Sequence, residues 1–256
     1  MPIIFLSPSL QEYNGYYDGS GSEKDYMNRV ADEMEPYLTA SGIKYVRNNP
    51  NASLSAAIAD SNRGKYDLHL ALHSNAAPPA LAGQLSGSDF YYYAVSIRGK
   101  NAATVLADNF TSVYPEPSKV RIMPTTTLAE LTRTAAPSVL VEIAYHDNPD
   151  DAEWIKNNIT AIAANLVQGL CELFDIPFIE PEEPPVYEEI PPNATVITEV
   201  DGLNIRRAPS LDSEIIGRIP RLARCRVYPF NDEWFIVDYN GVVGFSAARY
   251  LRVDPV

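Results

Sequence analysis

The sequence is poor in cysteine, histidine and basic residues, and it has no long apolar run. Its 256 residues include two cysteines and three histidines, and 33 Asp and Glu outnumber 20 Lys and Arg, for a formal net charge of −13. A nucleic-acid binder needs a Lys/Arg surface that releases phosphate counterions, so we expect no nucleic-acid partner. No run approaches the ~20 apolar residues that span a bilayer, so we expect no membrane insertion.

Two further scarcities concern redox chemistry and export. Cys171 and Cys225 lie far apart and form no Cys-x-x-Cys spacing, which favours two buried thiols. The segment 1–8 has four consecutive apolar residues and no leading positive charge, so we expect no signal peptide. Two routes to an extracellular target stay open on these grounds: release on lysis, or a secretion route that this segment does not reveal.

The apolar content is sufficient for a folded protein, and one segment divides the chain. Hydrophobic residues make up 46% of the sequence, which excludes general disorder. Residues 175–192 contain six acidic residues, six prolines and no Lys or Arg, a composition typical of an extended spacer. The sequence therefore predicts domains at residues 1–174 and 193–256, joined by an acidic, proline-rich linker.

Residues 1–174 alternate strand-like and helix-like patterns. Short apolar runs that end at turn residues predict strands, and apolar residues spaced three and four apart predict helices. The expected strands are 3–6, 43–46, 67–73, 89–95 and 138–143, and the expected helices are 23–40, 54–59, 99–113 and 151–174. This order predicts an α/β fold with a mostly parallel, twisted sheet and helices on both faces. In such sheets, functional sites form at the carboxyl ends of the strands.

Residues 193–256 carry a different pattern. Short β-rich runs are broken by Gly, Pro, Asn and Asp, which predicts a small all-β barrel. Residues 203–210 read Leu-Asn-Ile-Arg-Arg-Ala-Pro-Ser, and from Trp234 the segment follows the pattern Trp-x-x-Val-x-x-x-Gly-x-x-Gly-Phe. In both respects it resembles bacterial SH3-type (SH3b) domains.

One histidine is placed for chemistry. His73 is the last residue of its predicted strand and is followed by Ser-Asn-Ala, so it lies where sites form. His69 lies on the same face of the strand, about 13 Å away at ~3.3 Å per residue. We therefore interpret His69 as a core histidine, because two imidazoles at that separation cannot bind one ion.

Two carboxylates stand in apolar patterns. Glu23 precedes Met27 by four positions on the inward stripe of the first helix, where a carboxylate is costly unless it is paired or bound to a metal. The alternative is a carboxylate that the helix dipole favours at the helix start. Glu142 follows three apolar residues in a predicted buried strand, a setting expected of a general base. For Glu142 the alternative is a structural ion pair.

These positions carry a family resemblance. Gly-Ser-Glu-Lys-Asp at 21–25, Asp-Leu-His-Leu-Ala-Leu-His-Ser-Asn-Ala at 67–76 and Ala-Pro-Ser-Val-Leu-Val-Glu-Ile-Ala-Tyr-His-Asp-Asn at 136–148 resemble the motifs of zinc N-acetylmuramoyl-L-alanine amidases. The resemblance covers residues 1–174, and such amidases often carry an SH3b domain. It implies Zn²⁺ as cofactor, Glu23 and His73 as zinc ligands, and Glu142 as the catalytic carboxylate.

The sequence departs from the family at the first zinc ligand. The family's first strand leads into Asp-Pro-Gly-His-Gly-Gly, whereas this chain continues Ser-Pro-Ser-Leu-Gln at residues 7–11 and has no histidine there. The amide oxygen of Gln11 is a candidate replacement, although it is a harder ligand than imidazole. His146 is the other candidate. We assign His146 and Asn75 as substrate-binding or auxiliary residues.

The resemblance implies a hydrolase that degrades peptidoglycan by cleaving the amide between N-acetylmuramic acid and L-alanine of the stem peptide. Its partner would be the bacterial cell wall, as for an amidase or a phage endolysin. One alternative is an inactive wall-binding or regulatory protein on an amidase scaffold that lost its metal with the first histidine. Another is a metal enzyme that acts on a different acylated amino compound.

Overall fold

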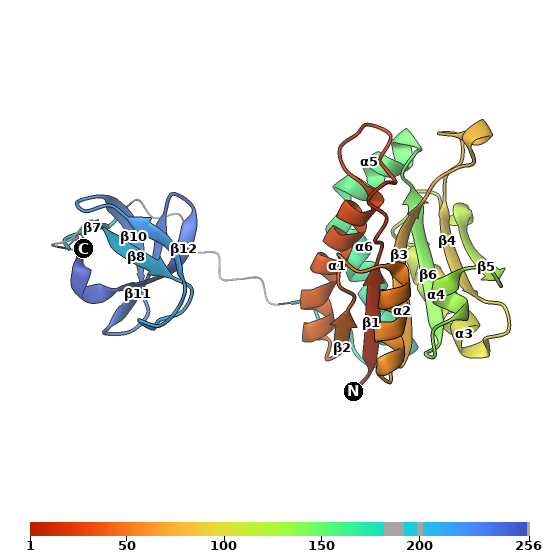
Figure 1. Cartoon of the computed structure of the whole chain (residues 1–256), viewed down its shortest axis with the longest axis horizontal. Coiled ribbons are helices and arrows are strands. Elements are labelled where there is room, and N and C mark those ends of the chain that lie inside the picture. Colours follow the sequence, from red (N-terminus) through yellow and green to blue (C-terminus); the bar gives the residue numbers. More distant parts are fainter. Residues whose placement is uncertain (182–191, 199–201, 255–256) are drawn as a thin grey trace. The chain divides into compact units, whose positions relative to one another are not determined.

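The chain folds into two compact units, Met1–Glu182 and Glu183–Val256 (Figure 1). The structure, a computed structural model, describes residues 1–181, 192–198 and 202–254. Most of the predicted spacer, residues 182–191, lies outside the described residues. Its first part packs on the first unit, because Ile176 and Phe178 contact the core and the ring of Phe178 stacks on Tyr37. Contact with the first unit therefore continues beyond residue 174.

The first unit is built on a six-stranded sheet with the order β2-β1-β3-β6-β4-β5. The strands are β1 (Ile3–Pro8), β2 (Lys44–Arg47), β3 (Leu68–Asn75), β4 (Ser88–Tyr93), β5 (Val120–Thr125) and β6 (Ser138–Tyr145). Neighbouring strands are parallel except for β4 and β6, which are antiparallel. The mostly parallel sheet is thus confirmed, while β5 is a strand that the sequence pattern did not predict.

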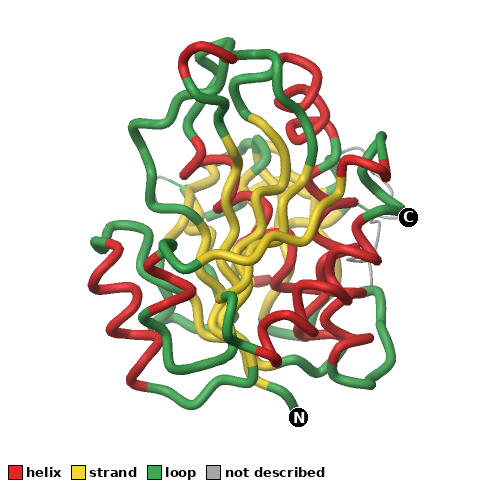
Figure 2. Tube along the Cα trace, turned by 90° about the vertical axis from the view of Figure 1, so that its right-hand side faces the viewer, coloured by secondary structure: helices red, strands yellow, loops and turns green. Residues whose placement is uncertain are grey.

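Helices cover both faces of this sheet. They are α1 (Glu23–Ala40), α2 (Leu54–Arg63), α3 (Ile97–Phe110), α4 (Ala129–Thr132), α5 (Pro149–Asn157) and α6 (Ile159–Leu173), with short 3-10 turns η1 (Pro79–Leu81) and η2 (Pro117–Lys119). Helices α1, α3 and α6 share one apolar cluster with the sheet, and α2 and α4 lie on the other face, toward the viewer in Figure 1. Figure 2 shows helices on both sides of the strands of this unit.

Strand alternation gives the two faces different characters. In β3, Leu70 and Leu72 join the large core beneath α1, α3 and α6, whereas Ala71 belongs to a small cluster on the opposite face. Because successive side chains point to opposite faces, His69 and His73 share the face of Ala71. The face toward α2 and α4 therefore carries the polar residues of the central strands.

Two helix boundaries decide the geometry nearby. Ser22 caps α1 in a capping box with Asp25, which places Glu23 in the first turn, buried at 1% exposure. The predicted single helix 151–174 is divided into α5 and α6 at Asn158, whose φ of −127° is not helical. The side chain of Asn158 donates to the carbonyl of Trp154 and so ends α5.

The second unit is an all-antiparallel β structure with its own core. Its strands, in the order β13-β7-β10-β11-β12-β8-β9, are β7 (Ala194–Val196), β8 (Leu203–Arg206), β9 (Ile215–Ile219), β10 (Arg224–Pro229), β11 (Trp234–Tyr239), β12 (Val242–Ala247) and β13 (Leu251–Val253), with a 3-10 turn η3 (Ala248–Tyr250). Cys225 lies in this core and Cys171 in that of the first unit, both as buried free thiols, as predicted. Within the described ranges, no helix is long and apolar enough to cross a bilayer.

Candidate functional site

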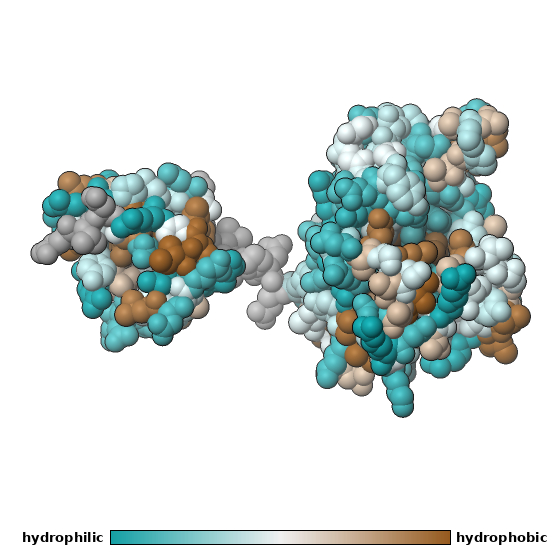
Figure 3. Space-filling view, viewed as in Figure 1, coloured by the Kyte–Doolittle hydropathy of each residue, from teal (hydrophilic) through white to brown (hydrophobic). Residues whose placement is uncertain are grey.

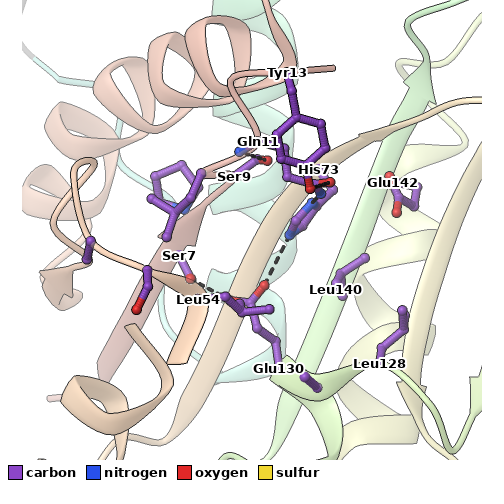
Figure 4. A pocket seen from close by; sticks show the side chains of 15 residues that line it. Ser7, Ser9, Gln11, Tyr13, Leu54, His73, Leu128, Glu130, Leu140 and Glu142 are labelled. Carbon is purple, nitrogen blue, oxygen red and sulfur yellow. Dashed lines mark hydrogen bonds and ion pairs between the residues drawn. The ribbon is translucent and has the colours of Figure 1, made fainter. Parts of the chain in front are cut away.

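A cavity of about 380 Å³ opens at the carboxyl ends of β1, β3 and β6, on the face toward α2 and α4 (Figure 4). Its wall is largely apolar, and its polar side chains include His73, Glu130 and Glu142. Figure 3 shows apolar residues gathered in the middle of this face of the first unit. Among the described residues, neither Lys nor Arg lines the cavity, so its charged groups are carboxylates and one imidazole.

The central contact of the site joins β3 to the first turn of α1. Nδ1 of His73 lies 2.7 Å from Oε1 of Glu23, and both side chains are at most 10% exposed. The amide of Asn14 donates to the second oxygen of Glu23 at 2.7 Å. Burial alone would raise the pKa of Glu23, but the hydrogen bond and positive charge of His73 hold it below its usual value.

Gln11 stands beside this contact with its amide nitrogen turned toward it. Nε2 of Gln11 lies 3.2 Å from Nδ1 of His73 and 3.4 Å from Oε1 of Glu23. Its oxygen accepts hydrogen bonds from the Tyr13 hydroxyl at 3.1 Å and from the Asn14 amide at 3.0 Å. The atom that could bind a metal, Oε1, therefore points away from His73 in this arrangement.

Glu130 is a functional candidate that the sequence analysis missed. It lies in the four-residue helix α4, is 5% exposed, and contacts the other nitrogen of His73, with Oε2 3.1 Å from Nε2. Its Oε1 lies 3.2 Å from Nε2 of His69. His69 is fully buried, as predicted, yet it and His73 both reach the one carboxylate although their strand positions are four residues apart. The sequence did hold one indication of Glu130, because His69 and His73 lie on one face of a buried strand and each needs a hydrogen-bond acceptor there.

His73 is thus held between two carboxylates. Burial alone would lower its pKa, but hydrogen bonds to Glu130 and Glu23, together with the charge of Glu142, raise the pKa well above the ordinary value. The pKa of Glu130 is lowered because its hydrogen bonds to His69 and His73 outweigh its burial.

Glu142 lies on β6 directly opposite His73 in the strand register. Its Oε2 is buried and has no hydrogen-bond partner among the described residues, whereas Glu23 and Glu130 each accept several bonds. Burial, reinforced by the negative charges of Glu23, Asp89 and Glu130 and opposed by His73, raises the pKa of Glu142 to about 7. Glu142 is therefore the carboxyl group of this cavity suited to exchange a proton near neutral pH.

The remaining two sequence candidates lie beside the cavity and do not line it. Nδ1 of His146 contacts the carbonyl of Ser74 at 2.8 Å and its hydroxyl at 3.0 Å, and its ring stacks on Tyr16. These contacts tie the exit of β6 to β3. Asn75 contacts the buried carboxylate of Asp89 at 3.4 Å. The structure thus brings Gln11, Glu23, His73 and Glu142 together, and it gives His146 and Asn75 other partners.

Two side chains of the site could bind a metal ion together, although a third ligand of the usual kind is lacking among the described residues. In the part of the chain that the structure describes, no three His, Cys, Asp or Glu side chains are arranged to hold one metal ion. Nδ1 of His73 and the carboxylate of Glu23 are donors of the kind that zinc binds, and they face each other at 2.7 Å. The surrounding charge favours a cation, because Glu23, Glu130 and Glu142 together exceed the single positive charge that His73 can carry.

Comparisons with known proteins identify a family for each of the two units. Residues 12–172, more than half of the chain, match the family described as N-acetylmuramoyl-L-alanine amidase, and residues 201–252 match the bacterial SH3 domain. No curated protein matches the chain.

Solved structures share the fold of the first unit. The catalytic domain of the amidase CwlV from Bacillus (Paenibacillus) polymyxa var. colistinus is 16% identical with a TM-score of 0.60, over 69% of this chain and 100% of that one. An N-acetylmuramoyl-L-alanine amidase from Clostridium difficile 630 is 17% identical with a TM-score of 0.61, over 68% and 97%. The catalytic domain of the CD27L endolysin, which targets Clostridia difficile, is 23% identical with a TM-score of 0.54, over 67% and 98%.

Proposed function

Because this chain belongs to the N-acetylmuramoyl-L-alanine amidase family, which hydrolyses an amide of peptidoglycan, we propose that it does so with a zinc ion held by His73 and Glu23 and with Glu142 as the proton-transferring group. The bond would be the amide between the lactyl group of N-acetylmuramic acid and L-alanine of the stem peptide. The site of action would be the bacterial cell wall. The proposal is supported chiefly by the unpartnered, buried Oε2 of Glu142 beside His73.

The residues present fit zinc with one change from the usual three-ligand pattern. His73 offers Nδ1 and Glu23 offers a carboxylate oxygen, and the negative charge around them would be balanced by a divalent cation. Gln11 is the third candidate by position, since its amide lies within 3.4 Å of both residues. To bind the metal, the Gln11 amide would have to rotate so that Oε1 takes the present position of Nε2. This rotation breaks the hydrogen bonds that Tyr13 and Asn14 now donate to Oε1.

Glu142 carries the proton chemistry in this proposal. When bound, zinc would supply Lewis-acid polarisation of the scissile carbonyl and acidification of water. Glu142 would take a proton from the attacking water as the water oxygen bonds to the carbonyl carbon. It would then pass that proton to the alanine nitrogen as the carbon–nitrogen bond breaks. A pKa of about 7 suits both transfers, because the carboxylate accepts a proton readily and its acid form releases it readily.

The apolar wall of the cavity would position the substrate. Leu54, Leu128 and Leu140 line the cavity on the side of α2 and α4. The two methyl groups that flank the scissile amide, one on the lactyl group and one on alanine, are of a size and polarity that such a wall accommodates. Contact with this wall would also exclude bulk water from Glu142.

The bacterial SH3 unit would hold the enzyme on the wall. Phe230 is 49% exposed and packs edge-on against Phe245, with ring centroids 5.0 Å apart. An exposed aromatic ring of this kind is a suitable contact for the peptide part of peptidoglycan. Phe230→Ala in the full chain should weaken cosedimentation with purified sacculi, and unchanged cosedimentation would contradict this role.

The decisive experiment digests purified sacculi with the zinc-loaded full chain. An amidase liberates new amino groups on L-alanine without creating new reducing sugar ends, and both products are measurable by labelling and mass spectrometry. Glu142→Gln should reduce this release by about 10²- to 10⁴-fold. The matched control is Glu116→Gln, which changes an exposed carboxylate whose partner is Lys119. Release of amino groups by Glu142→Gln at the wild-type rate would overturn the assignment of Glu142.

A second candidate function is favoured by Gln11 alone. The amide nitrogen of Gln11, a hydrogen-bond donor, occupies the position next to His73 and Glu23. That arrangement also suits a metal-free scaffold that binds the wall without cleaving it. Metal analysis separates the two functions, because the enzyme should bind about one zinc per chain and the scaffold none.

A further inference from the structure

We propose that Glu130 is a positioning residue for His73: it accepts the Nε2 proton of His73 and thereby leaves Nδ1 as the nitrogen that faces Glu23 and the metal position. This inference rests on the proposed zinc site and goes beyond it, because it identifies what orients the ligand. Glu130 lies in α4, more than fifty residues from His73 in the sequence.

Glu130 is held in place by two donors besides His73. The hydroxyl of Ser7 on β1 donates to Oε1 at 2.6 Å, and Nε2 of His69 on β3 lies 3.2 Å from the same oxygen. The third contact, at 3.1 Å, joins Oε2 to Nε2 of His73. A carboxylate that accepts from three side chains on two strands has little freedom to turn.

The direction of each hydrogen bond follows from the acceptor. An ionised carboxylate only accepts, so each imidazole nitrogen facing Glu130 must carry a hydrogen. His69 therefore has its proton on Nε2, and its Nδ1, 2.9 Å from Oγ of Ser61, can accept from that hydroxyl. Ser61 lies on α2, so the chain of hydrogen bonds runs from α2 through His69 and Glu130 to His73.

The same rule sets the tautomer of His73. In the metal-free structure both nitrogens of His73 face carboxylates, so by this rule both carry hydrogens. A metal ion beside Glu23 would take the place of the Nδ1 proton while the Nε2 proton stays on Glu130, so the neutral ring would present its lone pair at Nδ1. Without Glu130, no carboxylate would hold the remaining proton on Nε2. Carboxylates that hold the far nitrogen of a ligating histidine typically contribute 10- to 100-fold in metal affinity.

Glu130 is separate from the proton-transferring group. Oε2 of Glu142 has no partner among the described residues, whereas both oxygens of Glu130 are engaged. Glu130 and Glu142 thus line one cavity in different environments. Glu130 accepts hydrogen bonds from imidazole rings, and Glu142 has a free oxygen.

The test uses Glu130→Gln in the full chain labelled with ¹⁵N in its histidines. Gln offers one acceptor and one donor in the same volume, so one of the two imidazoles loses its acceptor. We expect the zinc dissociation constant to rise by about 10- to 100-fold. In the zinc-loaded wild type we expect one exchange-protected Nε2 proton on His73, and in the variant that signal should shift or disappear. A folded variant with unchanged zinc affinity and an unchanged His73 spectrum would overturn the proposal.

A second variant guards against misfolding of Glu130→Gln. Ser7→Ala removes one donor to Glu130 and leaves the carboxylate in place. It should weaken zinc binding by a few-fold and move the His73 Nε2 resonance in the same direction, and an unchanged resonance and affinity would refute the positioning role.

Failure of the zinc proposal itself is distinguishable from failure of this one. If the wild type binds no zinc, the proposed zinc site fails. The histidine spectrum of the zinc-free protein still reports whether Glu130 holds the Nε2 proton of His73, since that contact needs no metal. A His73 Nε2 resonance that Glu130→Gln leaves unmoved in the zinc-free protein would refute the positioning role independently.

Discussion

Nδ1 of His73 lies 2.7 Å from Oε1 of Glu23, a contact that joins the end of β3 to the first turn of α1 across fifty residues of sequence. A hydrogen bond and a shared metal ion both require these two atoms to face each other. Each residue should therefore be needed for zinc binding to the first unit.

Removal of either ligand should abolish stoichiometric zinc binding. His73→Ala and Glu23→Gln each leave one donor of the kind zinc prefers, which is too few for a stable site. We expect metal analysis after dialysis to fall from about one zinc per chain to near zero. Glu116→Gln, remote from the contact, should keep the wild-type value. Retention of zinc by both ligand variants would place the metal elsewhere.

Restoring an imidazole at position 11 should strengthen the site. Gln11 is within 3.4 Å of both His73 and Glu23, so Gln11→His brings a third zinc-type donor to the same position. Competition with a chelating dye should show affinity at least about tenfold higher than wild type, because imidazole suits zinc better than an amide. Gln11→Leu, similar in size and without a donor, serves as the control. Equal affinity in the His and Leu variants would show that position 11 does not approach the metal.

The metal-free protein should be stabilised by Glu142→Gln in a pH-dependent way. The pKa of Glu142 is raised to about 7, above the ~4.3 of an unfolded chain, so the native state binds its proton more tightly. Ionisation of Glu142 therefore costs stability as the pH rises from about 4.3 through 7. In urea unfolding with a chelator present, we expect the free energy of unfolding of the variant, relative to wild type, to rise by about 3 kcal/mol between pH 4.5 and pH 8. A difference that is constant with pH would contradict the raised pKa.

The buried carboxylate of Asp89 should depend on Arg121. Arg121 donates to both oxygens of Asp89, at 2.6 and 3.0 Å, and Asp89 is 2% exposed. Arg121→Ala leaves this buried carboxylate without a cation, with the 3.4 Å contact to Asn75 remaining, and should cost about 2 kcal/mol. This value is lower than that of a fully buried pair because the Arg121 side chain is 44% exposed.

The control for Arg121 is a pair on the surface. Arg63 binds Asp60 with its own side chain 79% exposed, so Arg63→Ala should change stability by less than about 0.5 kcal/mol. Equal losses in the two variants, measured by chemical unfolding, would show that the burial of Asp89 adds nothing.

Periodicity could not predict which strands pair with each other or in which direction. The apolar run around Phe90 predicts a strand, and the structure confirms it as β4. Its antiparallel pairing with β6 depends on the path of the chain between the two strands, which the run itself does not encode. β5 was not predicted because none of its residues is buried and it includes Pro124, so it lacks the continuous apolar run of the central strands. Similarly, the apolar stripe continues from α5 into α6, so the sequence predicted one helix. The division into two helices is visible only in the backbone conformation of Asn158.

The sequence by itself determined the alternation of strands and helices, the change of pattern after residue 192, and the positions of Glu23, His73 and Glu142. These depend on local periodicity and on charged residues in apolar runs, which any single segment displays. Only the tertiary structure decided that Glu130 from α4 stands between His69 and His73, and that Asn14 turns the Gln11 amide nitrogen toward the site. Such contacts join residues that are distant in sequence or depend on side-chain rotation, so no local pattern encodes them.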